Sequence, residues 1–213
     1  NPWPEDMVTG QNIVEWVRMG RMYAHCIIRG GSEYGAAWHE AAMGLGKKNA
    51  FYDFIDIAEY LIHAGWTKPS KLIATGLSNG GLLMTAISTL RPDLFGIVVA
   101  SVPHTDMLRF RGDPRGMMYI TEYGDPQGSE EMFRYMYSYS PYHNIKPGTV
   151  YPKMYVQTGE MDNNVPPYHG KKFAVRMQHD ADEQHPVLLQ VLAHGSHDRR
   201  RVLSEYRADA DFH

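Results

Sequence analysis

Apolar residues along the chain fall into short continuous runs separated by longer amphipathic stretches. Continuous runs, which are typical of strands buried in a parallel sheet, occupy 22–28, 72–74, 97–102, 153–157 and 187–192. Helical spacing of apolar residues marks 9–20, 49–63, 168–178 and 199–208. Because these strands alternate with helices, the pattern predicts an α/β fold with a mainly parallel sheet flanked by helices.

Polar and glycine residues give the expected ends of two helices. Gly20 closes the helix at 9–20, whereas Asn49 is the expected cap of the helix at 49–63 and Gly65 its stop.

The segment 71–90, KLIATGLSNGGLLMTAISTL, joins a buried strand to an apolar helix through the pattern G-x-S-x-G. Strand, G-x-S-x-G and helix in this order are the context of a nucleophile elbow, which holds a serine on a strained turn above the sheet. We expect Gly76 and Gly80 to be required because a Cβ at either position would clash. The backbone N–H of Asn79 would then donate to an oxyanion beside Ser78. A glycine-rich turn without chemistry is the alternative.

Two further residues complete a candidate triad in the order serine, acid, histidine. Asp162 follows the strand at 153–157, and His197 follows the strand at 187–192. A histidine can remove the serine proton at neutral pH, and an aspartate can orient that histidine. Asp162 could instead be a simple turn residue, and His194 competes with His197. The pair His194 and His197 could also suggest a metal site, but no third ligand lies nearby in the sequence.

Composition excludes several classes of protein. The 213 residues carry a formal net charge of −3, which gives no basic footprint for nucleic acid. No apolar run approaches membrane-spanning length, so no membrane partner is expected. The single cysteine, Cys26, lies in an apolar run and favours a buried thiol in a reducing compartment such as the cytoplasm. The sequence begins at Asn1 rather than methionine, so the lack of a visible signal peptide decides little.

Several long motifs resemble the catalytic domain of the prolyl oligopeptidase family of serine peptidases. They are RGGSEYGAAWHEA, GLSNGGLLMTAISTLRPDLFGIVVASVP, DMLRF, TEYGDP, YSPYHN and TGEMDNNVPPYHGKKFA. The resemblance extends from about residue 16 to about residue 197. It implies an α/β-hydrolase fold without a metal or cofactor. Its nucleophile corresponds to Ser78, its acid to Asp162 and its histidine to His197.

The resemblance also implies a substrate pocket. The family's stacking tryptophan corresponds to Tyr119, and the arginine that anchors the substrate backbone corresponds to Asn164, which cannot supply a charged bidentate donor. The remaining implied pocket positions are Tyr123, Val165 and His104.

The chain differs from the family in what it lacks. The family's second oxyanion donor is a tyrosine in a Y-G-G-F motif, which precedes the region that this sequence matches. We therefore expect residues 1–213 to form a partial α/β-hydrolase domain without its first strands and without the propeller domain. An upstream segment or a second chain would complete the sheet, or the strands at 22–28 and 72–74 would pair directly.

The sequence therefore predicts a serine peptidase that hydrolyses short peptides, with cleavage after proline implied by the resemblance. Two alternatives stay open: an esterase or other acyl hydrolase on the same fold, and a catalytically silent binding or oligomerisation module.

Overall fold

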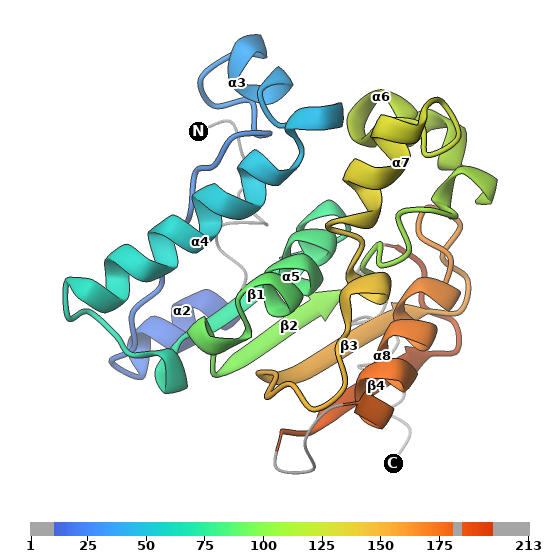
Figure 1. Ribbon diagram of the computed structural model, residues 1–213. Coiled ribbons are helices and arrows are strands. Elements are labelled where there is room, and N and C mark those ends of the chain that lie inside the picture. The colour runs from blue at the N-terminus through green and yellow to red at the C-terminus, as the bar shows by residue number, and fades with distance from the viewer. Residues whose placement is uncertain (1–10, 181–184, 198–213) are drawn as a thin grey trace.

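The computed structural model describes residues 11–180 and 185–197 (Figure 1). Its centre is a four-stranded parallel sheet whose spatial order, β1-β2-β3-β4, is also the order of the strands along the chain. The strands are β1 (Ile73–Leu77), β2 (Ile97–Ser101), β3 (Lys153–Gly159) and β4 (Val187–Leu192). The predicted α/β fold with a parallel sheet is confirmed, whereas the helix predicted at 199–208 lies outside the described residues.

The α-helices fill the connections between the strands and the region before β1. They are α2 (Gln11–Arg18), α3 (Ala36–Glu40), α4 (Lys48–His63), α5 (Asn79–Leu90), α6 (Ile120–Tyr123), α7 (Glu130–Tyr137) and α8 (Tyr168–Asp180). Short 3₁₀ turns join them, among them η4 (Phe110–Gly112) and η5 (Gly116–Tyr119). None of the helices described here is both long and apolar enough to cross a membrane.

Helices α5 and α8 lie on the same face of the sheet (Figure 1). Helix α5 packs on β1 and β2, α8 packs on β3 and β4, and α4 packs on α5. Parallel strands in sequential order, joined by right-handed crossovers, place their connecting helices on one face. The strands accordingly alternate between buried residues toward the helices, such as Val98 and Val156, and more exposed residues such as Ile97 on the opposite face.

Helix α5 is the most deeply buried helix of the described chain, with every residue from Gly81 to Ser88 buried. Its two buried hydroxyl side chains satisfy themselves within the helix. Thr85 Oγ1 donates to the carbonyl of Gly81 at 3.0 Å, and Ser88 Oγ donates to that of Met84 at 2.7 Å. These bonds offset the cost of burying the two hydroxyl groups, so a mainly apolar helix that contains Thr85 and Ser88 can lie in the core.

The strand predicted at 22–28 is wrong. This segment has no strand conformation, and Met22, Tyr23 and Ile27 are exposed. An apolar run becomes a strand only if a neighbour supplies its hydrogen-bond ladder, and within the described residues β1 pairs with β2 alone. The direct pairing considered between 22–28 and 72–74 is therefore also wrong. Cys26 is half-buried in this segment, and burial raises the pKa of its thiol.

One of the predicted helix ends is also wrong. Helix α4 begins at Lys48, and Asn49 is not its cap, because its side-chain amide donates to the carbonyl of Ala41 at 2.7 Å. Gly65 ends the helix as predicted, with a φ of +76° that few other residues adopt.

The turn between β1 and α5 depends on two close backbone contacts. A Cβ on Gly76 would lie 2.3 Å from the carbonyl oxygen of Gly80, and a Cβ on Gly81 would lie 2.8 Å from that of Ser101. The predicted clash at Gly80 itself is wrong, because nothing beyond its chain neighbours and the nearby backbone of α5 lies within 4 Å of a Cβ built there. Glycine is therefore required at Gly76, the first glycine of the pattern, and at Gly81, which directly follows the pattern.

We expect Gly76→Ala to lower the free energy of unfolding by about 3 kcal/mol, because the backbone of a packed turn must move to admit the methyl group. Gly80→Ala is the matched control, and it should leave stability unchanged or raise it by about 0.5–1 kcal/mol, since alanine favours a helix. Denaturant unfolding of both variants checks the difference. Equal effects would contradict the assignment of the clash to Gly76.

Candidate active site

Ser78 occupies a strained position between β1 and α5. Its φ of 58° and ψ of −113° lie outside the regions that ordinary residues favour. Its backbone N–H donates to the carbonyl of Ser101 at 2.9 Å, which ties the turn to the end of β2. Because this turn directly follows β1, the hydroxyl lies at the carboxyl end of the sheet, where parallel α/β folds bind ligands.

A hydrogen-bonded line joins the three residues predicted as a triad. Ser78 Oγ lies 2.9 Å from His197 Nε2, and His197 Nδ1 lies 2.8 Å from Asp162 Oδ2. A carboxylate can only accept, so Nδ1 donates to Asp162, and Nε2 is left to accept the proton of the serine hydroxyl. The three residues come from the ends of β1, β3 and β4, and the arrangement can transfer a proton from the serine to the imidazole.

The Asp162 carboxylate is held from two sides. Its second oxygen, Oδ1, accepts the backbone N–H groups of Asn164 at 2.8 Å and Val165 at 2.9 Å. The side chain is 0 % exposed, whereas that of His197 is 24 % exposed. Asp162 is therefore both a turn residue, which was the simpler alternative, and the partner of the histidine.

Backbone contacts bring the acid loop and the histidine loop together. The N–H of Glu160 donates to the carbonyl of Leu192 at 2.9 Å, and that of Met161 donates to the carbonyl of Gly195 at 3.0 Å. A Cβ on Gly159 would lie 2.3 Å from the same Gly195 oxygen. This contact places His197 beside Asp162, while His194 is exposed.

Asn79 begins α5, so its backbone N–H has no acceptor within the helix and can donate to a group beside Ser78. Its side-chain amide lies 3.5 Å from Glu122 Oε1, which also accepts from the buried ammonium of Lys47 at 2.6 Å. Burial lowers the pKa of Lys47, and Glu122 opposes that shift. A cavity of about 160 Å³ lies next to this group and is lined by Asn79, Gly80, Lys47, Gly30 and Gly31 among others.

Three residues implied for the substrate pocket form a ring cluster. The ring of His104 lies edge-on to those of Tyr119 at 5.3 Å and Tyr123 at 5.6 Å, measured between centroids. Two triad residues, Asp162 and His197, contribute to the pKa shifts of the cluster. Burial raises the pKa of Tyr119, and Asp162 adds to that shift; burial lowers the pKa of His104, and His169 and His197 act in the same direction.

The implied pocket residues differ in their access to solvent. His104, Tyr123 and Val165 are at most 2 % exposed, so in this chain they pack against neighbours. Tyr119 and Asn164 are half-buried and offer surface to a ligand. Asn164 and Val165 contact the triad through their backbone N–H groups, which donate to Asp162 Oδ1.

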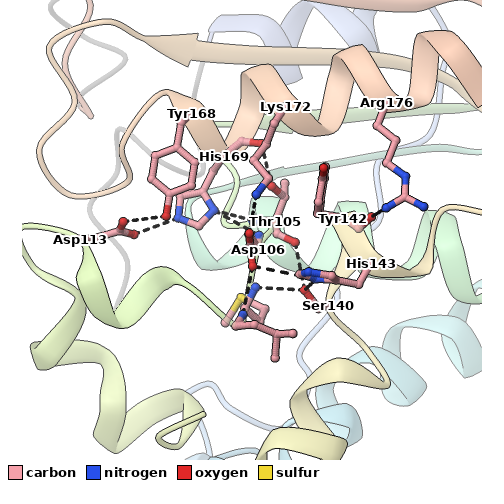
Figure 2. A network of polar contacts seen from close by, with 12 residues as sticks. Thr105, Asp106, Asp113, Ser140, Tyr142, His143, Tyr168, His169, Lys172 and Arg176 are labelled. Carbon is pink, nitrogen blue, oxygen red and sulfur yellow. Dashed lines mark hydrogen bonds and ion pairs between the residues drawn. The ribbon is translucent and has the colours of Figure 1, made fainter. Parts of the chain in front are cut away.

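Sequence reasoning missed a polar network behind the ring cluster, which Figure 2 shows. His169 and Lys172 project from α8 toward the loop that holds Thr105 and Asp106, whereas Arg176 points toward Tyr142 and donates to its carbonyl at 2.9 Å. Lys172 forms an ion pair with Asp106, and His169 Nε2 lies 2.9 Å from Asp113 Oδ2. Because these partners lie more than 50 residues apart, no local motif signals their contacts.

His104, Asp113 and His169 place possible ligand atoms within 4.8 Å of one another, a spacing that suggests a metal site. The hydrogen bonds of His169 argue against one. A histidine that binds a metal through Nε2 normally donates its other N–H to an acceptor. Here Nδ1 instead receives the backbone N–H groups of Thr105 and Asp106, so metal ligation would require an imidazolate.

Burial holds the pKa of His104 well below its ordinary value of 6.5, so the folded protein keeps this imidazole neutral. Unfolding exposes it, and the unfolded state then binds an extra proton below pH 6.5, so stability falls as the pH is lowered. We expect His104→Leu to remove about 1 kcal/mol per pH unit from this dependence between about pH 6 and pH 5.

Chemical denaturation at a series of pH values measures this slope. The buried, non-titrating Val98 is the control, because Val98→Ala should lower stability without changing the slope. Parallel slopes for His104→Leu and the unmodified protein would contradict a neutral, buried His104.

Known proteins are similar to this chain over most of its length. The family model described as "Prolyl oligopeptidase family" matches residues 8–213. Prolyl endopeptidase of Elizabethkingia meningoseptica is 40 % identical over 194 residues, which cover 91 % of this chain and 28 % of the relative. Prolyl endopeptidase of Dictyostelium discoideum is 42 % identical over 181 residues, covering 84 % of this chain and 24 % of the relative.

A solved structure reported under "Structural and Mechanistic Analysis of Two Prolyl Endopeptidases" superposes with a TM-score of 0.84 at 39 % identity. The match covers 87 % of this chain and 27 % of that one. The chain thus spans about a quarter of the length of the relatives that it matches. On the extent and identity of these matches, the chain belongs to the prolyl oligopeptidase family.

Proposed function

We propose that this chain carries the catalytic centre of a serine peptidase that cleaves short peptides after proline. The observation that carries the proposal is the line of hydrogen bonds from Ser78 through His197 to Asp162. Family membership supports the same chemistry, and relatives named prolyl endopeptidase support the preference for proline.

In the proposed mechanism Ser78 Oγ attacks the carbonyl carbon of the scissile bond while His197 Nε2 takes the hydroxyl proton. Asp162 stabilises the imidazolium through Nδ1–H, and the Asn79 N–H donates to the oxyanion. The intermediate collapses when His197 returns the proton to the leaving amine nitrogen, which leaves an acyl-enzyme. Water then attacks the ester carbonyl, gives its proton to His197 and releases the acid, and Ser78 recovers its proton.

We further propose that residues 1–213 belong to one catalytic domain whose sheet is completed by a segment from outside this sequence or by a second chain. Two observations support this: β1 has a single strand neighbour in the described part of the sheet, and the relatives are about four times longer. Such a segment could bring the second oxyanion donor. The lone cysteine supports the cytoplasm as the compartment.

Ser78→Ala in the whole polypeptide should lower kcat for a proline-containing peptide by roughly 10⁶-fold, because the nucleophile is lost. A fluorophosphonate should label the unmodified protein at Ser78 and leave the variant unlabelled. Ser129→Ala, which changes a hydroxyl at the start of α7, is the control and should keep full activity. A loss of tenfold or less for Ser78→Ala would reject Ser78 as the nucleophile.

Two peptides that differ only in proline or alanine before the scissile bond test the substrate preference. We expect kcat/KM to be at least about tenfold higher for proline, since a shaped apolar pocket discriminates at about this level. Tyr119→Ala should reduce that ratio by removing the accessible ring of the cluster. Equal rates for both peptides, with fast hydrolysis of a simple aryl ester, would favour an esterase instead.

A further inference from the structure

The buried imidazole of His169 on α8 forms hydrogen bonds with two other segments near the candidate active site, the Thr105 loop and the loop of Asp113. His169 lies in the first turn of α8 and is 0 % exposed. Its Nδ1 lies 3.2 Å from the backbone nitrogen of Thr105 and 3.1 Å from that of Asp106, while its Nε2 lies 2.9 Å from Asp113 Oδ2. Figure 2 shows the ring between Asp113 on one side and the Thr105 loop on the other.

These contacts specify one protonation state of the ring. Backbone N–H groups can only donate, so Nδ1 must present its lone pair to Thr105 and Asp106. The ring proton therefore resides on Nε2 and is donated to Asp113. A second proton on Nδ1 would face two donors, so the three bonds exist together only in the neutral Nε2–H form.

Each of the three segments leads to the ring cluster or to the acid loop. His104 directly precedes Thr105, and its ring lies edge-on to that of His169 at 5.2 Å. Asp113 lies between η4 and η5, and η5 ends at Tyr119. Helix α8 follows the acid loop. The backbone N–H of His169 donates to the carbonyl of Pro166 in that loop at 3.1 Å.

We propose that His169 is a positioning residue for substrate binding, because it fixes the ring of Tyr119 and the loop of His104 relative to the acid loop without touching the substrate. The proposal rests on the proposed function, since a pocket at Tyr119 has meaning only if a peptide binds there. An apolar residue of similar size would leave two backbone donors unpaired and would remove the histidine partner of Asp113 Oδ2, so the polar ring specifies a geometry that simple packing does not.

Two substitutions separate the two sides of the ring. His169→Asn places an amide oxygen near the position of Nδ1, so it keeps an acceptor for Thr105 and Asp106 but loses the bond to Asp113. His169→Gln places an amide nitrogen near Nε2, so it keeps the donor to Asp113 but loses the acceptor. In both variants we expect kcat/KM for a proline-containing peptide to fall about tenfold, mainly through a higher KM, because small displacements of positioning groups cost rates of this order.

A fluorophosphonate reports on the triad without occupying the peptide pocket. Its rate of labelling Ser78 should stay within about twofold of the unmodified protein in both variants. Tyr168→Phe is the matched control, since it removes a 2.7 Å hydrogen bond to Asp113 Oδ1 and leaves every bond of His169 in place. This variant should keep peptide turnover within about twofold, and thermal unfolding checks that each variant is folded.

Three outcomes would overturn the proposal: unchanged peptide turnover in both folded variants, an equal loss of peptide turnover and labelling, or an equal loss in Tyr168→Phe. Nitrogen NMR of the unmodified protein gives an independent check that needs no variant. Signals of a ring protonated at Nε2 support the proposal, and a proton on Nδ1 rejects it. Failure of the proposed function is distinguishable, because the unmodified protein would then not be labelled at Ser78.

Discussion

The close contact between Gly76 and the carbonyl oxygen of Gly80 is the constraint on which the rest of the site depends. It lets the chain reverse from β1 into α5 within one residue, and Ser78 absorbs the reversal at a φ of 58°. Because the serine N–H is tied to Ser101 on β2, the hydroxyl has a fixed position above the sheet. The burial of α5 on β1 and β2 supports this turn, so a serine in a strained conformation precedes the most deeply buried helix of the described fold.

Two imidazoles near this turn show how hydrogen bonding sets the chemistry of one side-chain type. His197 donates through Nδ1 to Asp162 and keeps the Nε2 lone pair for the serine hydroxyl, which is the arrangement of a base. His169 has the opposite pattern, because Nδ1 accepts two backbone N–H groups and Nε2 donates to Asp113. It has no lone pair left for catalysis or for a metal. The same ring therefore supports a proton transfer at one position and a fixed geometry at the other.

Within the described residues the candidate triad is complete, whereas few of the implied pocket side chains are accessible. The serine, histidine and acid are joined by hydrogen bonds, and the backbone N–H of Asn79 at the start of α5 has no acceptor within the helix. The implied pocket residues are mostly buried, and only Tyr119 and Asn164 offer surface. This agrees with a chain that spans about a quarter of its relatives' length, since the rest of a binding site can come from other segments. The hydrogen-bonded serine, histidine and acid thus lie at one edge of the parallel sheet, whereas most of the implied pocket side chains are covered by their neighbours.

The sequence by itself determined the parallel α/β fold, the bounds of β4, and Ser78, Asp162 and His197 as the residues that meet at the sheet edge. Those inferences hold because the ends of parallel strands share one edge, whatever the details of packing. Tertiary structure decided the rest. An apolar run at 22–28 is not a strand because no strand in the described part of the chain pairs with it, and the Asn49 side chain bonds Ala41 rather than capping its helix. The pairs Lys47–Glu122 and His169–Asp113 join residues 75 and 56 positions apart, so only the folded chain brings their charges and lone pairs into contact.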